Sequence, residues 1–486
     1  MTHLFQRIVT LCIALLVTAG AFGQTVPVEV TAALQRARVP LDSVSLFIAR
    51  ADATSPPLLS HRAQTPMNPA STMKLVTTFA ALDLLGPNYT WRTPVWLDGK
   101  VRDGVLNGNL VIQGQGDPKL VVERLWLLLR RVQALGVRQI DGDIVLDSSA
   151  FAPMALDAAE FDGEPLRPYN ATPDALLINF KSVVMTFTPD LANGVARIQY
   201  EPPLAGVQRP DKVALTADRS AACGDYRAAL KADFSAPQRI RFDGSYPLSC
   251  AEKVWPLAYS DPASFNARAV AGLWQSMGGV LTGTAREGAA PATEATFEVL
   301  SPTLTELVRD VNKFSNNVMA QQVFLTLGRA TATADKAAPA TKEAAREATR
   351  RWWQQRIAAD APDAASTRNA AWPPPDMDNG AGLSRRARIT AASLGRLLQV
   401  AYASPLMPEL MSSLPIVGVD GTLKRSLAKP HSAHLKTGSL KDVLALAGYV
   451  HAVNGQRYCL VALINHPNAR AAKPALDALV DWTVAQ

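Results

Sequence analysis

Apolar and polar positions in the first ninety residues predict two short strands followed by a helix. Residues 43–50 and 58–61 are rich in apolar and β-branched side chains, and the polar run between them contains two adjacent prolines, which indicates a turn. Across residues 69–85, apolar side chains recur at helical spacing. Asn68 and Gly86 flank this segment, and both are residue types that cap helices. We therefore predict a helix over 69–85.

Residues 96–254 have a different sequence pattern from the segments before them, because Gly, Asp and Asn separate short β-like segments there. One helical stretch, 120–135, interrupts these segments. Helical patterns return at 264–277 and 304–327, and an Ala/Glu/Arg-rich helical stretch continues to Ile357. This order predicts a core domain that is interrupted by a long β-rich insertion.

In the last sixty residues, apolar and polar side chains alternate as in the strands of an antiparallel sheet. Strand patterns occupy 434–440, 443–452 and 456–464, and Asn454-Gly455 joins the last two. Asn-Gly between apolar runs is the strongest short hairpin signal. An amphipathic helix over 472–484 is placed to pack on this sheet.

The first residues have the pattern of a secretory signal. Arg7 precedes an apolar run over 8–17, and small residues follow up to Gly23, after which we expect cleavage and export. The alternative is an uncleaved membrane anchor, but the run is shorter than the roughly 20 apolar residues that a bilayer requires. We divide the chain into a signal peptide (1–23), the first part of the core (24–95), an inserted β-rich region (96–254) and the second part of the core (255–486).

Composition and charge fit an ordinary globular protein. The chain has 486 residues, of which 48% are hydrophobic and 19% charged, and its net charge is +7. No block of Lys and Arg marks a nucleic-acid surface. Cys12 lies in the signal, Cys223 and Cys250 are 27 positions apart, and Cys459 lies alone in a strand pattern. In an exported chain we predict a disulfide between Cys223 and Cys250 and a buried thiol at Cys459; the alternative is three free thiols.

A nucleophile and a base are placed together at the start of the predicted 69–85 helix. Ser71 and Lys74 are three positions apart, so they share a helix face and their side chains can meet. A serine hydroxyl needs a base to take its proton, and a lysine serves only if its pKa falls by roughly 3 units. The spacing alone is weak evidence, because Ser426 and Lys429 match it too.

Two later motifs add hydroxyl, amide and cationic groups. Ser315-Asn316-Asn317 supplies a second hydroxyl and a carboxamide, although Ser264-Phe265-Asn266 has the same spacing. Lys436-Thr437-Gly438-Ser439 is rarer and falls on a predicted strand, where glycine lets a substrate backbone approach closely. The alternative interpretation of this motif is a lysine at a sheet edge, followed by a turn.

The order of the three motifs is the combination found in penicillin-binding proteins and β-lactamases. Here the sequence resembles the D-Ala-D-Ala carboxypeptidase/endopeptidases of the class C low-molecular-mass penicillin-binding proteins, the penicillin-binding protein 4 family. The resemblance covers nearly the whole mature chain, including the long insertion after the first motif. It is carried by residues 71–74, 142–147, 169–171, 176–179, 315–320, 380–385, 436–440 and 446–449. Gln321 and Ala381 depart from the residues that family members often have.

The resemblance implies an α+β fold with a transpeptidase-like core, in which an antiparallel sheet is flanked by helices, and a large β-rich insertion between the first two motifs. It implies acyl transfer without a cofactor or metal, on peptidoglycan peptides that end in D-Ala-D-Ala, with β-lactams as covalent inhibitors. It also implies a periplasmic or other extracytoplasmic location, with at most peripheral membrane contact. The implied roles are Ser71 as nucleophile, Lys74 as base, Ser315 as proton relay, the N–H groups of Ser71 and Ser439 as oxyanion hole, and Asn317, Lys436, Thr437 and Gly438 as substrate-binding residues.

Three other functions compete with this interpretation. A β-lactamase or esterase on the same scaffold is disfavoured by the Ser-x-Asn second motif and by the insertion. A non-catalytic module that binds the wall or senses β-lactams is disfavoured by the intact motifs. A zinc peptidase is disfavoured more strongly still, because the six histidines include no His-Glu-x-x-His spacing.

Overall fold

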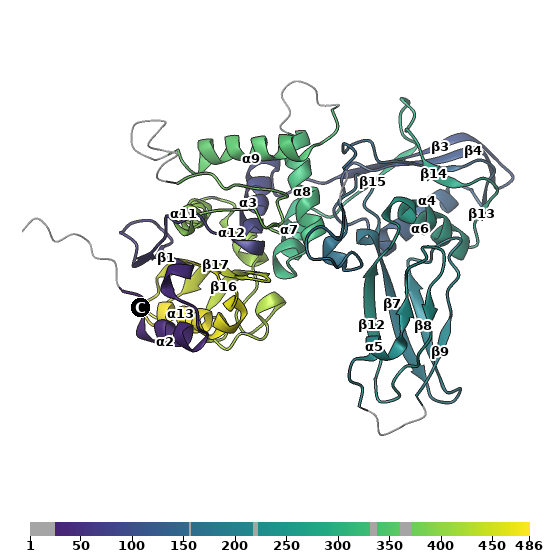
Figure 1. Ribbon diagram of the computed structural model, residues 1–486. Helices are drawn as coiled ribbons and strands as arrows, with labels where there is room; N and C mark the ends of the chain where they lie inside the picture. The colour runs from purple at the N-terminus through teal and green to yellow at the C-terminus, as the bar shows by residue number, and fades with distance from the viewer. Residues whose placement is uncertain (1–24, 155–156, 217–221, 331–337, 360–371) are drawn as a thin grey trace, which may run out of the picture.

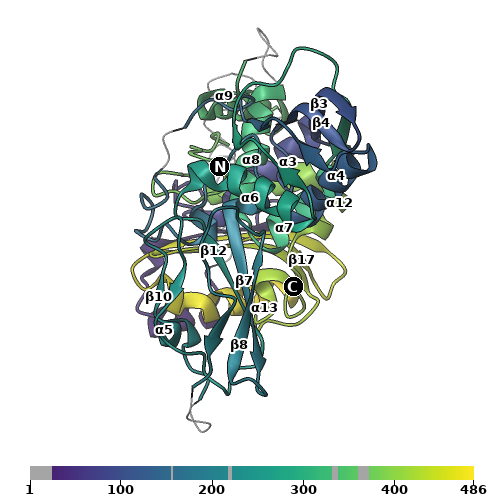
Figure 2. The same ribbon diagram turned by 90° about the vertical axis from the view of Figure 1, so that its right-hand side faces the viewer.

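The computed structural model describes residues 25–154, 157–216, 222–330, 338–359 and 372–486. The predicted signal peptide lies outside these ranges. The chain forms two bodies side by side (Figure 1): a core built from both ends of the chain, and a β-rich body built from its middle. Figure 2 views the molecule from the side of the β-rich body.

The core contains a five-stranded antiparallel sheet in the order β16-β17-β18-β1-β2. Strands β1 and β2 come from the start of the chain, and β16, β17 and β18 come from its end. The two sets meet where β1 pairs with β18 along its whole length. The predicted hairpin at Asn454-Gly455 is confirmed. The strands are β1 (Val44–Arg50), β2 (Leu59–His61), β16 (Ala433–Leu440), β17 (Val443–His451) and β18 (Arg457–Asn465).

Helices cover both faces of this sheet. On one face, α13 and α2 pack on each other and α13 also packs on β17, while α11 packs on β1, β17 and β18 within a second cluster of buried apolar side chains. A helical region continues from that second face toward the β-rich body (Figure 1). The helices of the core are α2 (Val28–Arg36), α3 (Lys74–Leu85), α7 (Leu304–Lys313), α8 (Asn317–Ala330), α9 (Lys342–Arg356), α11 (Ala391–Tyr402), α12 (Met407–Ser413) and α13 (Lys473–Val484).

Two helix predictions need correction. The segment 69–85 begins as the 3-10 helix η2 (Ala70–Met73) and becomes α-helical only at Lys74. The pattern over 304–327 is not one helix but two, α7 and α8, because Ser315 between them has a φ of 58°. Both breaks coincide with left-handed backbone at a non-glycine residue, which local sequence patterns do not reveal.

In its described residues, the β-rich body contains three sheets. The first has seven strands, β3 (Arg92–Arg102), β4 (Val105–Gln113), β5 (Gln139–Ile140), β6 (Ile144–Asp147), β13 (Val280–Leu281), β14 (Ala285–Glu287) and β15 (Phe297–Leu300). The second has four, β7 (Ser182–Asp190), β8 (Val195–Glu201), β9 (Lys212–Ala214) and β12 (Lys253–Ala258), and the third pairs β10 (Ala232–Asp233) with β11 (Arg241–Phe242). The helices of this body are α4 (Val122–Ala134), α5 (Tyr226–Leu230) and α6 (Pro262–Ser276).

Helix α6 and strand β15 belong to the same apolar cluster as the strands of the inserted region, so that packing continues past residue 254 to Val299. The division of the chain into domains stays a prediction. The disulfide between Cys223 and Cys250 is confirmed, as is the buried thiol of Cys459. Within the described ranges, no helix is long and apolar enough to cross a membrane.

Candidate active site

Two asparagines hold the turn that carries Ser71. The side-chain oxygen of Asn68 accepts a hydrogen bond from the N–H of Ala70 at 2.9 Å. Asn465, the last residue of β18, accepts from the backbone N–H of Asn68 at 2.8 Å and donates to its carbonyl at 3.0 Å. The turn is therefore fastened to the end of a central strand of the core sheet.

Two glycines allow other segments to lie directly against this turn. Ala70 has a left-handed φ of 45°, and a Cβ at Gly382 would collide with its carbonyl oxygen. A Cβ at Gly438 on β16 would lie 2.7 Å from the carbonyl oxygen of Pro69. The backbone that approaches Gly438 thus belongs to the Ser71 turn itself, whereas the sequence had suggested a substrate backbone.

The ammonium group of Lys74 is fully buried and donates to three acceptors. Its Nζ lies 2.9 Å from Ser71 Oγ, 2.7 Å from Asn317 Oδ1 and 2.6 Å from the carbonyl oxygen of Ala381. Burial lowers the pKa of Lys74 well below its usual range, and the charge of Lys436 lowers it further. A hydroxyl and a lysine with a depressed pKa are therefore in direct contact.

A second buried lysine contacts the second hydroxyl. Lys436 Nζ donates to Ser315 Oγ at 2.9 Å and to the carbonyl oxygen of Thr437 at 2.8 Å. Burial lowers the pKa of Lys436 to about 7. The left-handed φ of Ser315 ends one helix and precedes the next, so that its side chain leaves the helical region toward β16. The Thr437 hydroxyl donates to the hydroxyl of Thr422 at 2.7 Å.

The structure joins the predicted site residues into two groups. The charge of Lys436 in one group lowers the pKa of Lys74 in the other. The first group is Ser71, Lys74 and Asn317, and the second is Ser315, Lys436 and Thr437, with Gly438 and the exposed Ser439 next along β16. The duplicate motifs lie elsewhere: Ser426 donates to Asp477 at 2.6 Å, and Ser264 accepts from Arg268 at 3.0 Å.

Several contacts of the site were not predicted from the sequence. The carbonyl of Ala381 belongs to a segment that the family resemblance included, but a backbone acceptor has no residue-type signature. The carbonyl of Tyr169, from the β-rich body, accepts from Asn317 Nδ2 at 3.2 Å. Asn465 and Thr422 carry no motif at all. Among the described residues, no cluster of His, Cys, Asp and Glu is arranged to hold a metal ion.

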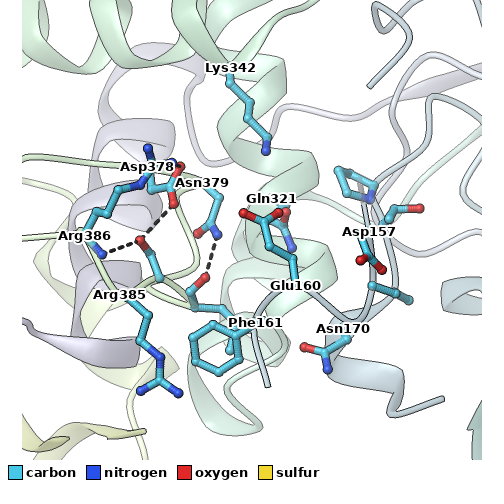
Figure 3. Close-up of a pocket in the computed structure, with 16 residues that line it drawn as sticks. Asp157, Glu160, Phe161, Asn170, Gln321, Lys342, Asp378, Asn379, Arg385 and Arg386 are labelled. Atoms are coloured by element: carbon cyan, nitrogen blue, oxygen red, sulfur yellow. Dashed lines mark hydrogen bonds and ion pairs between the residues drawn. The ribbon is translucent and has the colours of Figure 1, made fainter. Parts of the chain in front are cut away.

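A cavity of about 320 Å³ borders the site. Figure 3 shows it between Gln321 on α8, the 378–386 loop and the segment around Asp157. It adjoins the Ser71 turn, because Leu383 in its wall packs against Ala70. Charged side chains of both signs line it: Asp157, Glu160, Asp378, Lys342, Arg385 and Arg386.

Comparisons with known proteins agree with this geometry. The D-Ala-D-Ala carboxypeptidase 3 (S13) family model matches residues 28–486. The D-alanyl-D-alanine carboxypeptidase of Actinomadura sp. strain R39 is 28% identical over 475 residues, which are 91% of this chain and 81% of that protein.

Solved structures of penicillin binding protein 4 from Haemophilus influenzae have the same fold. One superposes with a TM-score of 0.70 at 22% identity, covering 93% of this chain and all of that chain. A second, complexed with a β-lactam, superposes with a TM-score of 0.63 at the same identity and coverage. The likeness confirms the predicted fold class.

The asparagine that fastens the Ser71 turn provides a first prediction. Asn465→Ala leaves the backbone N–H and carbonyl of the buried Asn68 without partners, which we expect to cost about 2 kcal/mol of unfolding free energy. Urea titration measures the loss. Asn468→Ala, at an exposed position three residues later, is the matched control and should change stability by less than about 0.5 kcal/mol. Equal losses in the two variants would contradict the assignment.

Proposed function

This chain belongs to the D-Ala-D-Ala carboxypeptidase 3 (S13) family, and from that premise we propose that it cleaves peptidoglycan peptides through an acyl-enzyme on Ser71. The family predicted from the motifs is thereby confirmed, and the protein is a serine-type D-Ala-D-Ala carboxypeptidase. The observation that carries the proposed mechanism is the set of three oxygens in hydrogen-bond contact with Lys74 Nζ.

The lone pair of a neutral Lys74 can face only one of the three oxygens around its Nζ. A neutral amine has two N–H donors and one lone pair, and the carbonyl oxygens of Asn317 and Ala381 can only accept hydrogen bonds. The Asn317 amide is oriented by its N–H donation to Tyr169, which leaves its oxygen facing Lys74. The two carbonyls therefore take both N–H donors. The lone pair then faces the Ser71 hydroxyl, which supports Lys74 as the base.

The proposed reaction begins when Ser71 Oγ attacks the carbonyl carbon between two D-amino acids and Lys74 Nζ takes its proton. Collapse of the tetrahedral intermediate breaks the peptide bond, and the departing amine receives, through Ser315, the proton that Lys74 had taken. Water then attacks the ester carbonyl and gives a proton to Lys74, which returns it to Ser71 Oγ as the acid leaves.

The oxyanion is assigned to the backbone N–H groups of Ser71 and Ser439. The close packing of Gly438 on Pro69 supports this assignment, because it brings β16 against the Ser71 turn. Preorganised donors of this kind each contribute roughly 100-fold or more in rate.

Lys436 and Thr437 are assigned to the carboxylate that follows the scissile bond. The side chain of Lys436 supplies positive charge and that of Thr437 a hydroxyl on the same strand, a suitable pair for one carboxylate. Crosslinks have a D-residue with a free carboxylate at the same place, so the proposal includes endopeptidase cleavage. It also includes covalent inhibition by β-lactams, which the complex of the similar Haemophilus influenzae protein supports.

The adjacent cavity supports a peptide substrate with charged side chains. Arg385 lies over the ring of Phe161 at 4.6 Å, and the carboxylates of Asp157 and Glu160 also line the cavity (Figure 3). Since such substrates lie outside the cytoplasm, we also assign export to the leader at residues 1–23.

Covalent labelling tests the nucleophile. Ser71→Ala should abolish labelling by a fluorescent penicillin on a denaturing gel, because among the described residues Ser71 supplies the only hydroxyl that contacts Lys74 Nζ. The controls are Ser426→Ala and Ser264→Ala, which alter the two duplicate motifs and should label like the wild type. Labelling that persists in Ser71→Ala would remove Ser71 from its role.

The pKa of Lys436 predicts a pH dependence. Since this pKa is about 7, the free enzyme has the positive charge below that pH and loses it above. We expect kcat/KM for a peptide with a free terminal carboxylate to fall above that pKa, approaching tenfold per pH unit. A thioester substrate whose leaving group lacks a carboxylate should not show this alkaline fall. The same fall for both substrates would contradict the carboxylate assignment.

A further inference from the structure

A further hydroxyl lies beside that of Thr437 and belongs to none of the three motifs. Thr422 is on the short 3-10 helix η5 (Gly421–Leu423), and its exposed side chain lies 2.7 Å from the Thr437 hydroxyl. A hydroxyl has one donor and two acceptor positions. In this arrangement Thr437 gives its proton to Thr422, and the Thr422 proton remains available to an incoming acceptor.

An ion pair between a buried lysine and a partly exposed aspartate fixes the position of Thr422. Lys313 Nζ lies 2.6 Å from Asp420, and the Lys313 side chain is only 4% exposed. Lys313 stands two residues before Ser315, and Asp420 two residues before Thr422. The pair therefore ties together the two backbone segments that present these hydroxyls.

Two further contacts prevent the Asp420 segment from shifting. The second oxygen of Asp420 accepts from the N–H of Ile416 at 2.8 Å. Gly421 has a left-handed φ of 54°, and a Cβ there would lie 2.6 Å from the carbonyl oxygen of Lys313. Burial raises the pKa of Asp420, but hydrogen bonds from Lys313 and Ile416 and the charge of Lys313 outweigh it and lower this pKa overall. Asp420 therefore stays ionised at neutral pH.

We propose that Thr422 is a specificity residue that binds the terminal carboxylate of the substrate together with Thr437, and that the Asp420–Lys313 pair positions it. A carboxylate has two oxygens that accept several hydrogen bonds. Because the two hydroxyls are adjacent, an arriving carboxylate replaces the Thr437–Thr422 hydrogen bond, and each hydroxyl then turns its proton toward a carboxylate oxygen while Lys436 supplies charge from the strand. The inference rests on the proposed function and adds to it a determinant of preference for a chain end.

The test compares Thr422→Val with Thr422→Ser on two substrates. One is a peptide ending in D-Ala-D-Ala with a free carboxylate, and the other is a thioester whose leaving group has none. Thr422→Val removes the hydroxyl at nearly constant volume, so kcat/KM for the peptide should fall about tenfold, mainly through KM, because a hydrogen bond to a charged group is lost. Its kcat/KM for the thioester should stay within twofold of wild type, and Thr422→Ser should restore the peptide value.

The outcomes separate this inference from the proposed function. If Thr422→Val leaves the peptide kcat/KM unchanged, or lowers both substrates equally, the specificity role of Thr422 is wrong, while penicillin labelling of Ser71 stands untouched. If the wild type neither hydrolyses the peptide nor labels with penicillin, the proposed function and the inference fall together. A thermal melt of each variant shows whether it is folded.

A double-mutant cycle tests the positioning pair. Asp420→Asn keeps the shape of the side chain and removes its charge, and it should raise KM for the carboxylate peptide. If Asp420 acts through Thr422, the same change in the Thr422→Val background should raise KM by clearly less. Equal increases in the two backgrounds would show that Asp420 does not position Thr422.

Discussion

The burial of Lys74 without a carboxylate partner is the constraint on which the rest of this site depends. The groups that accept from its Nζ are a hydroxyl, a side-chain amide and a backbone carbonyl. Removing an ammonium from water costs several kcal/mol when no anion compensates it, and Lys436 adds repulsion. The neutral amine is therefore the less costly state in the folded protein. Folding supplies the free energy that makes this lysine fit to accept a proton.

The lowered pKa of Lys74 persists only where water and flexible carboxylates are kept away. Segments that are far apart in the sequence therefore pack around this one lysine. Asn317 comes from the helical region, the Ala381 carbonyl from a loop that closes on the Ser71 turn, and Lys436 from the edge strand β16. The β-rich body takes part as well, since the Tyr169 carbonyl fixes which end of the Asn317 amide faces Lys74. The insertion therefore contributes to the chemistry of the site at a point where an amide flip would place an N–H against the amine.

The parts predicted from the sequence are those that local chemistry determines. Alternation and Asn454-Gly455 predicted the terminal sheet, Gly86 the end of a helix, and the Ser71–Lys74 spacing a contact that the structure contains. Spacing alone was insufficient, because Ser426 and Lys429 share it and lie elsewhere. The rest depends on tertiary contacts. The 3-10 start at Ala70 lies directly against Gly382, a contact from far along the chain, and neither the Ala381 carbonyl nor Thr422 has a signature that a motif could reveal.

Ala70 and Ser315 are non-glycine residues with left-handed backbone at the site, and this local conformation destabilises the folded state. Each costs about 1 kcal/mol relative to ordinary helical backbone, and each lies beside a hydroxyl–lysine contact. A continuous helix through Ser315 would have been favoured locally, but it would have directed this hydroxyl along the helix face instead of toward Lys436. The Lys313–Asp420 pair immediately before the break holds the end of α7 in place. Strained backbone of this kind persists only where the surrounding contacts determine it, and here those contacts come from Asn68 and Asn465 at the first turn and from the Lys313–Asp420 pair at the second.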